Sequence, residues 1–236
     1  MTDDSSTPSA SPAADAQSPG ARWVSEDSPE PRRVGQGLSL VYFGIIFVLL
    51  GVTGGAFGSM IAAFLSLEFA IGGILVVAGL MIFAGVVMNF VGPVLCLAVP
   101  DETGAKELIL AAVFLQVLNP AAALAQFVLG SPVLGLLGAL AGAIGMICFM
   151  LFLRQLAFFI EREDFAQRAS NLLVFAGVLA GVFFLTILGF LASVVSESLA
   201  FGLSGLLMFP IGMGGLICLV RYAGFVNDLR RHLLRD

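Results

Sequence analysis

The sequence predicts an all-α integral membrane protein whose six transmembrane helices form three antiparallel hairpins, with both termini in the cytoplasm. Three observations lead to this prediction. The chain of 236 residues is 59% hydrophobic and only 11% charged, whereas about a quarter of the residues in a soluble domain are charged. Its mean hydropathy is +1.04. Its 11 Lys and Arg residues fall into four short clusters that long apolar stretches separate.

The spacing of the basic clusters predicts the topology. Each gap between clusters is long enough for two membrane crossings, since one crossing needs about 20 apolar residues. Basic residues beside membrane helices collect on the cytoplasmic side. Each gap is therefore expected to hold one helical hairpin that leaves the cytoplasm and returns to it. The clusters are Arg22, Arg32 and Arg33; Lys106; Arg154, Arg162 and Arg168; and Arg221, Arg230, Arg231 and Arg235.

The first 35 residues differ in composition from the rest of the chain. They are rich in Ser, Pro, Ala and Asp, and their one aromatic residue is Trp23. Such a segment buries too little apolar surface to offset its ordering entropy, so residues 1–35 are predicted to form a disordered acidic cytoplasmic tail. Residues 36–225 form the predicted six-helix domain. Residues 226–236 are predicted to form a short basic segment that continues the sixth helix along the membrane surface.

Each predicted helix is an apolar run between polar or turn-forming residues. The outer connections are expected to be a few residues long, near 66–68, 130–132 and 196–198. The inner connections are the polar sequence PDETGAKE at 100–107 and the charged segment 161–168. The predicted helices cover about residues 37–65, 69–99, 107–130, 133–160, 170–195 and 199–225.

Two segments at the predicted cytoplasmic connections resemble other proteins. LCLAVPDETGA at 95–105 and LRQLAFFI at 153–160, followed by AQRA at 166–169, are similar to segments of uncharacterised multi-pass membrane proteins of planctomycete-type bacteria. The similarity covers about residues 35–230. It implies a six-helix protein of the bacterial cytoplasmic (inner) membrane. It carries over no activity and no functional residue.

Enzymatic chemistry finds little support in the sequence. The motif GLSG at 202–205 resembles the nucleophile motif of rhomboid intramembrane proteases, but Ser204 would need a histidine within hydrogen-bond reach. The one histidine, His232, lies 28 residues further on, or about 42 Å along a helix. No HExxH or comparable set of zinc ligands is present. The chain is therefore predicted not to be an enzyme and to use no cofactor, and no basic patch predicts nucleic-acid binding.

Neutral polar groups are the remaining candidates for a site within the membrane, because no charged residue lies near the centre of a predicted helix. Asn119–Pro120 and Pro210 are candidate helix breaks, which line substrate cavities in some transporters. The alternative is that these prolines are ordinary features of membrane helices. The speculative cavity consists of Gln116, Asn119, Pro120 and Pro210. The neutral polar groups of the apolar runs are Thr53, Ser59, Asn89, Gln116, Asn119, Gln126, Thr186 and Ser204.

Arg154 and Arg221 occupy matching positions at the inner ends of the fourth and sixth predicted helices. One interpretation is an interfacial contact with a lipid headgroup or another anionic ligand between the hairpins. The other is that each side chain reaches the membrane interface by itself.

Pairs of small residues at four-residue spacing predict faces where helices approach closely. The pair Gly138 and Gly142 is expected to meet the pair Gly177 and Gly181 on the next helix. The remaining pairs are Gly51/Gly55, Gly54/Gly58 and Ala141/Gly145.

The sequence names no substrate. We expect a non-catalytic accessory or assembly component of the membrane, and the alternative is a carrier or channel for a small neutral or lipophilic solute. A lipid-processing enzyme that uses Arg154, Glu161, Arg162 and Arg221 is the third hypothesis, and it lacks a nucleophile. The expected partner is the lipid bilayer. Other membrane proteins and a homo-oligomer stay open as further partners.

Overall fold

The computed structural model describes residues 19–20, 23, 29–195 and 200–234, and all regular secondary structure within them is helical. For Glu68, Pro132, Leu179 and residues 183–195 and 200–211, only the backbone is described. The elements are α2 (Pro29–Phe64), α3 (Glu68–Leu95), the short 3-10 helices η1 (Cys96–Ala98) and η2 (Asp101–Thr103), α4 (Lys106–Leu129), α5 (Pro132–Phe159), α6 (Glu163–Val195) and α7 (Ala200–Leu233).

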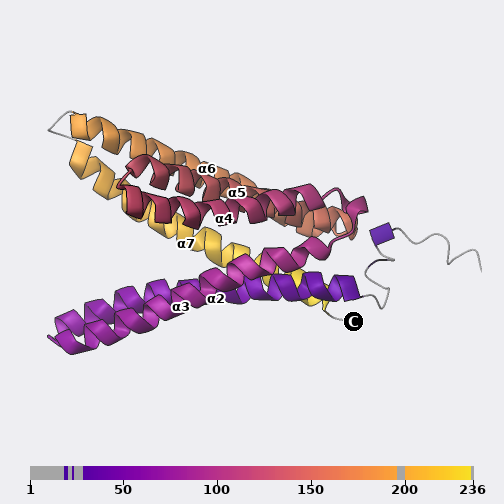
Figure 1. Ribbon diagram of the computed structural model, residues 1–236, viewed down its shortest axis with the longest axis horizontal. Helices are drawn as coiled ribbons and strands as arrows, with labels where there is room; N and C mark the ends of the chain where they lie inside the picture. Colours follow the sequence, from indigo (N-terminus) through magenta and orange to yellow (C-terminus); the bar gives the residue numbers. More distant parts are fainter. Residues whose placement is uncertain (1–18, 21–22, 24–28, 196–199, 235–236) are drawn as a thin grey trace, which may run out of the picture.

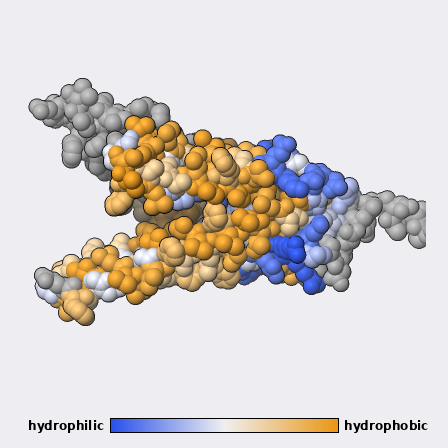
Figure 2. All heavy atoms as spheres, viewed as in Figure 1, coloured by the Kyte–Doolittle hydropathy of each residue, from blue (hydrophilic) through white to orange (hydrophobic). Residues whose placement is uncertain are grey.

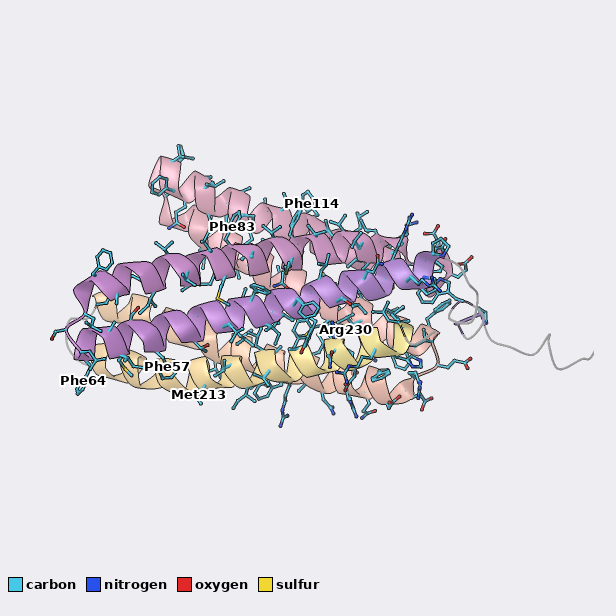
Figure 3. All side chains as sticks on the ribbon, turned by 90° about the horizontal axis from the view of Figure 1, so that it is seen from below. Phe57, Phe64, Phe83, Phe114, Met213 and Arg230 are labelled. Atoms are coloured by element: carbon cyan, nitrogen blue, oxygen red, sulfur yellow. The ribbon has the colours of Figure 1, made fainter. Side chains whose placement is uncertain are left out.

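Five of the described helices, α2 to α6, are long and apolar enough to cross a membrane. The shortest of them, α4, has 24 residues, which gives a length of about 36 Å against about 30 Å of bilayer hydrocarbon. Large apolar side chains cover the outward faces, and Phe69 and Phe127 are 99% and 89% exposed. Figure 3 shows others on α2, α3 and α4, namely Phe57, Phe64, Phe83 and Phe114. Such a surface suits lipid and not water, so this is a multi-pass membrane protein.

The long helices form two arms that meet at one end and diverge toward the other (Figure 1). One arm consists of α2 and α3, and the other consists of α4 to α7. Where the arms meet, α7 packs on α2. Hydrophilic residues gather at this same end, which we call the polar end, and the surface is hollowed between the arms toward the opposite end (Figure 2).

The core lies near the polar end, where segments from both arms come together. Its largest members have almost no exposed surface, and they come from five different helices. The arms are therefore joined by apolar packing close to the polar end, and each arm is separate beyond it. The buried residues of this core include Val34, Leu38, Cys96, Ile109, Phe152, Leu153, Leu156, Val226 and Leu229.

Glycines spaced by seven residues bring α2 and α3 into close contact. Gly37 and Gly44 on α2 face Gly92 and Gly85 on α3, and seven residues are close to two helical turns. A Cβ atom on Gly44 would lie 2.8 Å from the Gly85 carbonyl oxygen, and one on Gly92 would lie 2.7 Å from the Gly37 carbonyl oxygen. The two backbones are therefore too close for any side chain at these positions, and the arm forms a tightly packed pair.

The prediction that Gly138 and Gly142 meet Gly177 and Gly181 is wrong. A Cβ atom on Gly142 would meet the Asn119 side chain on α4, and one on Gly138 would meet Asn119 and Ala122 of the same helix. Gly177 and Gly181 have no atom within 4 Å of such a Cβ among the described residues. The short turn between α4 and α5 pairs these two helices, so the small-residue face of α5 is already occupied.

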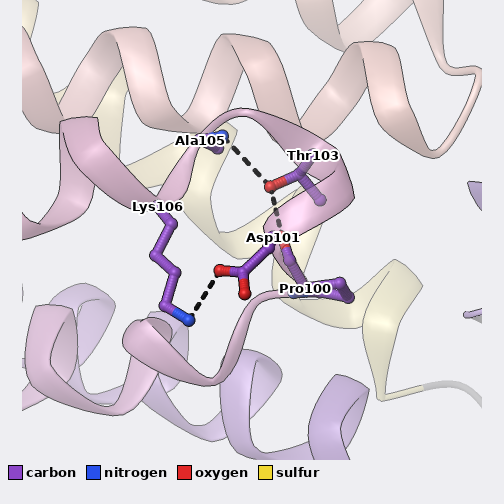
Figure 4. A network of polar contacts seen from close by, with 5 residues as sticks. All are labelled: Pro100, Asp101, Thr103, Ala105 and Lys106. Carbon is purple, nitrogen blue, oxygen red and sulfur yellow. Dashed lines mark hydrogen bonds and ion pairs between the residues drawn. The ribbon is translucent and has the colours of Figure 1, made fainter.

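The connection between α3 and α4 is fixed by local hydrogen bonds (Figure 4). The Thr103 hydroxyl donates to the Pro100 carbonyl oxygen at 2.8 Å and accepts from the Ala105 N–H at 3.1 Å. Thr103 is buried, and the following Gly104 takes a left-handed conformation with φ 63°. The Lys106 ammonium group lies 2.6 Å from the Asp101 carboxylate on the surface. This short, ordered turn holds the start of one arm against the end of the other.

Both predicted terminal segments differ from the structure at their boundaries. Residues 29–35 belong to α2, and Trp23 is buried at 6% exposure, with its ring centroid 5.9 Å from that of Phe159. Residues 1–18, 21–22 and 24–28 of the predicted tail lie outside the described residues. At the other terminus, α7 continues to Leu233 and buries Val226, Leu229 and Leu233 in the core. Residues 226–233 therefore continue α7 and pack on the bundle.

Candidate functional site between the two arms

A groove of about 710 Å³ separates α3 of one arm from α4 and α5 of the other. Ligand sites for small molecules have about 300–1,000 Å³, so this groove can hold an organic molecule of moderate size. Most of its wall is aliphatic or aromatic, and three carboxamide side chains interrupt it. The residues that form the wall include Val86, Asn89 and Phe90 on α3 and Gln116, Asn119 and Pro120 on α4.

The groove lies deep in the apolar part of the protein. Asn119 is the fourteenth of the 24 residues of α4, or about 20 Å along the helix from its start at the polar end. Water does not reach polar groups at the centre of a bilayer, so each of them needs a partner from the protein or from a ligand. The hydrogen bonds of the three carboxamides therefore decide what the groove can bind.

Gln116 presents two acceptors that lack their usual donors. Its side-chain Oε1 atom is buried, with no hydrogen-bond partner. In the continuous helix α4, its carbonyl oxygen would accept from the N–H of residue 120. That residue is Pro120, which has no N–H. The helix continues through Asn119–Pro120 without a break, so the predicted interruption is absent, but the missing donor remains.

Asn119 and Asn89 are positioned by glycines on the neighbouring helices. A Cβ atom on Gly142 of α5 would lie 2.7 Å from the Asn119 Nδ2 atom, and one on Gly44 of α2 would lie 2.7 Å from the Asn89 Nδ2 atom. The Asn89 Nδ2 group donates to the Gly85 carbonyl oxygen at 3.0 Å, which leaves its Oδ1 atom as an acceptor. The Asn119 side chain makes no hydrogen bond within the described part of the chain.

The lining of the groove is uncharged, and its carboxamides offer free acceptors as well as free N–H donors. An anion or a cation would find no compensating charge there, and transfer of an ion to this depth is costly. A largely apolar molecule with a hydroxyl or amide N–H could fill the volume and donate to the Oδ1 atom of Asn119, whose side chain is exposed in the groove. The arrangement therefore suits a neutral, lipophilic hydrogen-bond donor.

The structure brings together Gln116, Asn119 and Pro120, three of the four residues of the predicted cavity. The side chain of the fourth, Pro210, lies outside the described residues, and its position falls within α7. Sequence reasoning did not include Asn89 in the cavity. An isolated carboxamide in an apolar helix could have indicated that Asn89 belongs to a site. Nothing in the sequence shows, however, that this part of α3 faces α4.

Arg154 and Arg221 are held in different surroundings. The Arg154 guanidinium lies over the Phe158 ring of its own helix, at 5.3 Å from the centroid. Arg221 lines a pocket between α6 and α7 together with Arg168 and Asn171, and Arg154 is not part of that pocket. The structure therefore does not place these two arginines in one contact.

Among the described residues, no group of three or more His, Cys, Asp and Glu residues lies close enough to hold a metal ion. The cysteines Cys96, Cys148 and Cys218 are free thiols. No protein family, no curated protein and no solved structure matches this chain. The groove is therefore interpreted from its own geometry.

Proposed function

We propose that this protein binds a neutral, lipophilic molecule with a hydrogen-bond donor in the groove between α3 and α4, and that it carries or presents this molecule within the membrane. The observation that supports the proposal is the unpartnered carboxamide of Asn119, which is exposed in the uncharged wall of the groove. At this depth in the membrane, an acceptor without a donor costs about 1–3 kcal/mol. A ligand that supplies the donor recovers that free energy and also fills the apolar volume.

The proposed setting is the inner membrane of a bacterium, with six helices in three antiparallel hairpins and both termini in the cytoplasm. The distribution of Lys and Arg along the sequence supports this orientation. Under this proposal the polar end faces the cytoplasm. The groove then opens to the lipid at about the middle of the bilayer, where a lipophilic molecule can enter sideways.

An accessory or assembly role remains the alternative proposal. It would place a helix of a partner membrane protein, and not a small molecule, between the arms. A helix surface packs by close backbone approach and needs no free hydrogen-bond donor. The donor requirement therefore distinguishes the two proposals.

The test uses a long-chain fatty alcohol that carries a diazirine, together with its methyl ether, which has the same shape but no donor. The full chain in phosphatidylcholine vesicles is labelled by light, and the adducts are mapped by mass spectrometry. We expect the alcohol to label residues 86–90 and 116–123 more strongly than the ether does, by about fivefold or more, as one hydrogen bond at this depth implies. Asn119→Leu should remove the difference.

Thr53→Val is the matched control, because the Thr53 hydroxyl donates to the Leu49 carbonyl oxygen within α2 and does not line the groove. It should leave the labelling pattern unchanged. Equal labelling by alcohol and ether, or labelling spread evenly over all lipid-facing helices, would contradict the proposal and leave the assembly role as the better explanation.

A further inference from the structure

A second pocket lies between α6 and α7, on the side of the bundle near the polar end. It has a volume of about 350 Å³, and it combines charged and apolar walls. Arg168 and Asn171 contribute from α6, and Arg221 contributes from α7. The apolar wall consists of Leu172, Phe175 and Phe225. None of these residues belongs to the groove between the arms.

The two arginines of this pocket differ in their partners. Arg168 donates to the Asp228 carboxylate, with an Nη1–Oδ2 distance of 3.1 Å. Both side chains of this pair are about half exposed, at 58% and 48%. Arg221 makes no ion pair within the described part of the chain. The pocket therefore keeps one positive charge that the protein does not neutralise.

The unneutralised charge is also the deeper of the two. Arg221 precedes Asp228 by seven residues on α7, so it lies about 10 Å further from the polar end than the ion pair does. A cationic group beneath the membrane interface is costly unless an anion accompanies it. The phosphates of lipid headgroups lie at the interface, which the long side chain of Arg221 can reach, whereas a soluble anion would have to leave water.

The walls of the pocket match the two parts of a lipid. The guanidinium of Arg221 and the Asn171 amide can both donate hydrogen bonds to phosphate oxygens, and an arginine can do so with two N–H groups at once. Phe175 and Leu172 offer apolar surface for the beginning of an acyl chain. Gly224 adds open space, since a Cβ atom there would have no neighbour within 4 Å.

We propose that the pocket between α6 and α7 binds the phosphate headgroup of an anionic membrane phospholipid, with Arg221 as the principal phosphate ligand and Arg168 and Asn171 at its side. The site is separate from the groove between the arms, and it is independent of the function proposed for that groove. It gives the protein a preference for anionic lipid on the side of the polar end.

The test measures lipid binding by the full chain in detergent. Phosphatidylglycerol or phosphatidylcholine is added, bound lipids are counted by native mass spectrometry, and Tm is recorded. We expect wild type to retain one more phosphatidylglycerol than phosphatidylcholine, and its Tm to rise by about 3 °C with phosphatidylglycerol alone. Arg221→Gln should lose both effects. Arg221→Lys, which keeps the charge but not the planar fork, should retain part of them.

Arg154→Gln is the matched control, because Arg154 is also an exposed arginine near the polar end but lies outside the pocket. It should behave like wild type. Equal losses in Arg154→Gln and Arg221→Gln would overturn the proposal, because they would show attraction by overall charge and no site. An equal rise in Tm with soluble glycerol phosphate would also overturn it, in favour of a soluble phosphate compound. The proposal would also be overturned if phosphatidylglycerol had no effect on wild type.

Discussion

The guanidinium of Arg230 in α7 lies 4.5 Å from the ring centroid of Tyr42 in α2. The neighbouring ring of Phe43 is 5.0 Å away, and the Arg230 Nε group donates to the Asn227 side chain at 2.9 Å. Figure 3 shows Arg230 where α7 runs beside α2. Because these helices belong to different arms, a charged side chain and an aromatic pair connect the arms at the rim of the apolar core.

We expect Arg230→Met to lower the stability of the junction between the arms. A cation–π contact of this kind contributes about 0.5–2 kcal/mol, which corresponds to a fall in Tm of about 2–6 °C for a chain of this size. Thermal unfolding in detergent measures the change. A double-mutant cycle with Tyr42→Leu should give a coupling energy of the same size, whereas Arg231→Met combined with Tyr42→Leu should give none. Additive effects of Arg230 and Tyr42 would contradict the contact.

Close packing of α2 on α3 predicts opposite effects at two kinds of glycine. Gly92→Ala places a methyl group 2.7 Å from the Gly37 carbonyl oxygen, and overpacking of this kind costs about 1–3 kcal/mol. Gly177→Ala meets no atom within 4 Å and should be neutral or stabilising by up to about 1 kcal/mol. Thermal unfolding of both variants in the same detergent measures the difference. If Gly177→Ala is the more destabilising of the two, the assignment of the packed faces is wrong.

The order and apolar character of the helices could be predicted from the sequence, because a membrane span needs about 20 apolar residues and basic residues mark its ends. The faces by which the helices contact one another could not be predicted in this way. Gly51/Gly55 and Gly177/Gly181 have the same spacing, yet Gly55 packs on Ala78 and Gly181 faces open space. In lipid every outward face is apolar too, so hydrophobicity no longer separates the inside from the outside.

The candidate groove shows the same limit. Gln116, Asn119 and Pro120 could be proposed together because they lie within five positions of one helix. Asn89 comes from the other arm, and its place in the groove depends on how the arms are arranged. The sequence also predicted a break at Pro120, whereas α4 continues through it. The Asn119 side chain lies in the space that Gly142 leaves on the neighbouring helix α5. A prediction from the residues around Pro120 alone does not include this contact between helices.

Trp23 is expected to contribute to stability although it precedes the first long helix. Its ring packs edge-on against Phe159, and its Nε1 group is buried without a hydrogen-bond partner. Trp23→Ala should lower the free energy of unfolding by about 3 kcal/mol through the loss of buried aromatic surface. Trp23→Phe keeps most of that surface and removes the unpaired N–H, so it should cost little. Unchanged thermal unfolding of Trp23→Ala in detergent would mean that this segment does not dock on the helices in solution.

The proposed orientation predicts which connections are accessible from outside the cell. A cysteine introduced at Ser66, which is exposed in the turn between α2 and α3, should react with a membrane-impermeant maleimide in intact cells. A cysteine introduced at Glu102, which is exposed in the connection between α3 and α4, should react only after the membrane is opened. The native cysteines provide the background, which wild type measures. The reverse pattern of labelling would invert the proposed topology.

The unpartnered acceptor of Gln116 predicts that removal of this side chain does not lower stability. Gln116→Leu removes a buried carbonyl group without a donor, so the free energy of unfolding should stay the same or rise by about 1 kcal/mol in the absence of ligand. The same variant should keep the preferential labelling by the fatty alcohol, because the buried Oε1 atom does not reach the groove, whereas Asn119→Leu should lose that preference. A side chain that only connected helices would behave in the opposite way, because its removal would break a hydrogen bond and lower Tm. A fall in Tm of Gln116→Leu would therefore show that its side chain connects helices, and unchanged labelling of Asn119→Leu would remove the main support for a ligand in the groove.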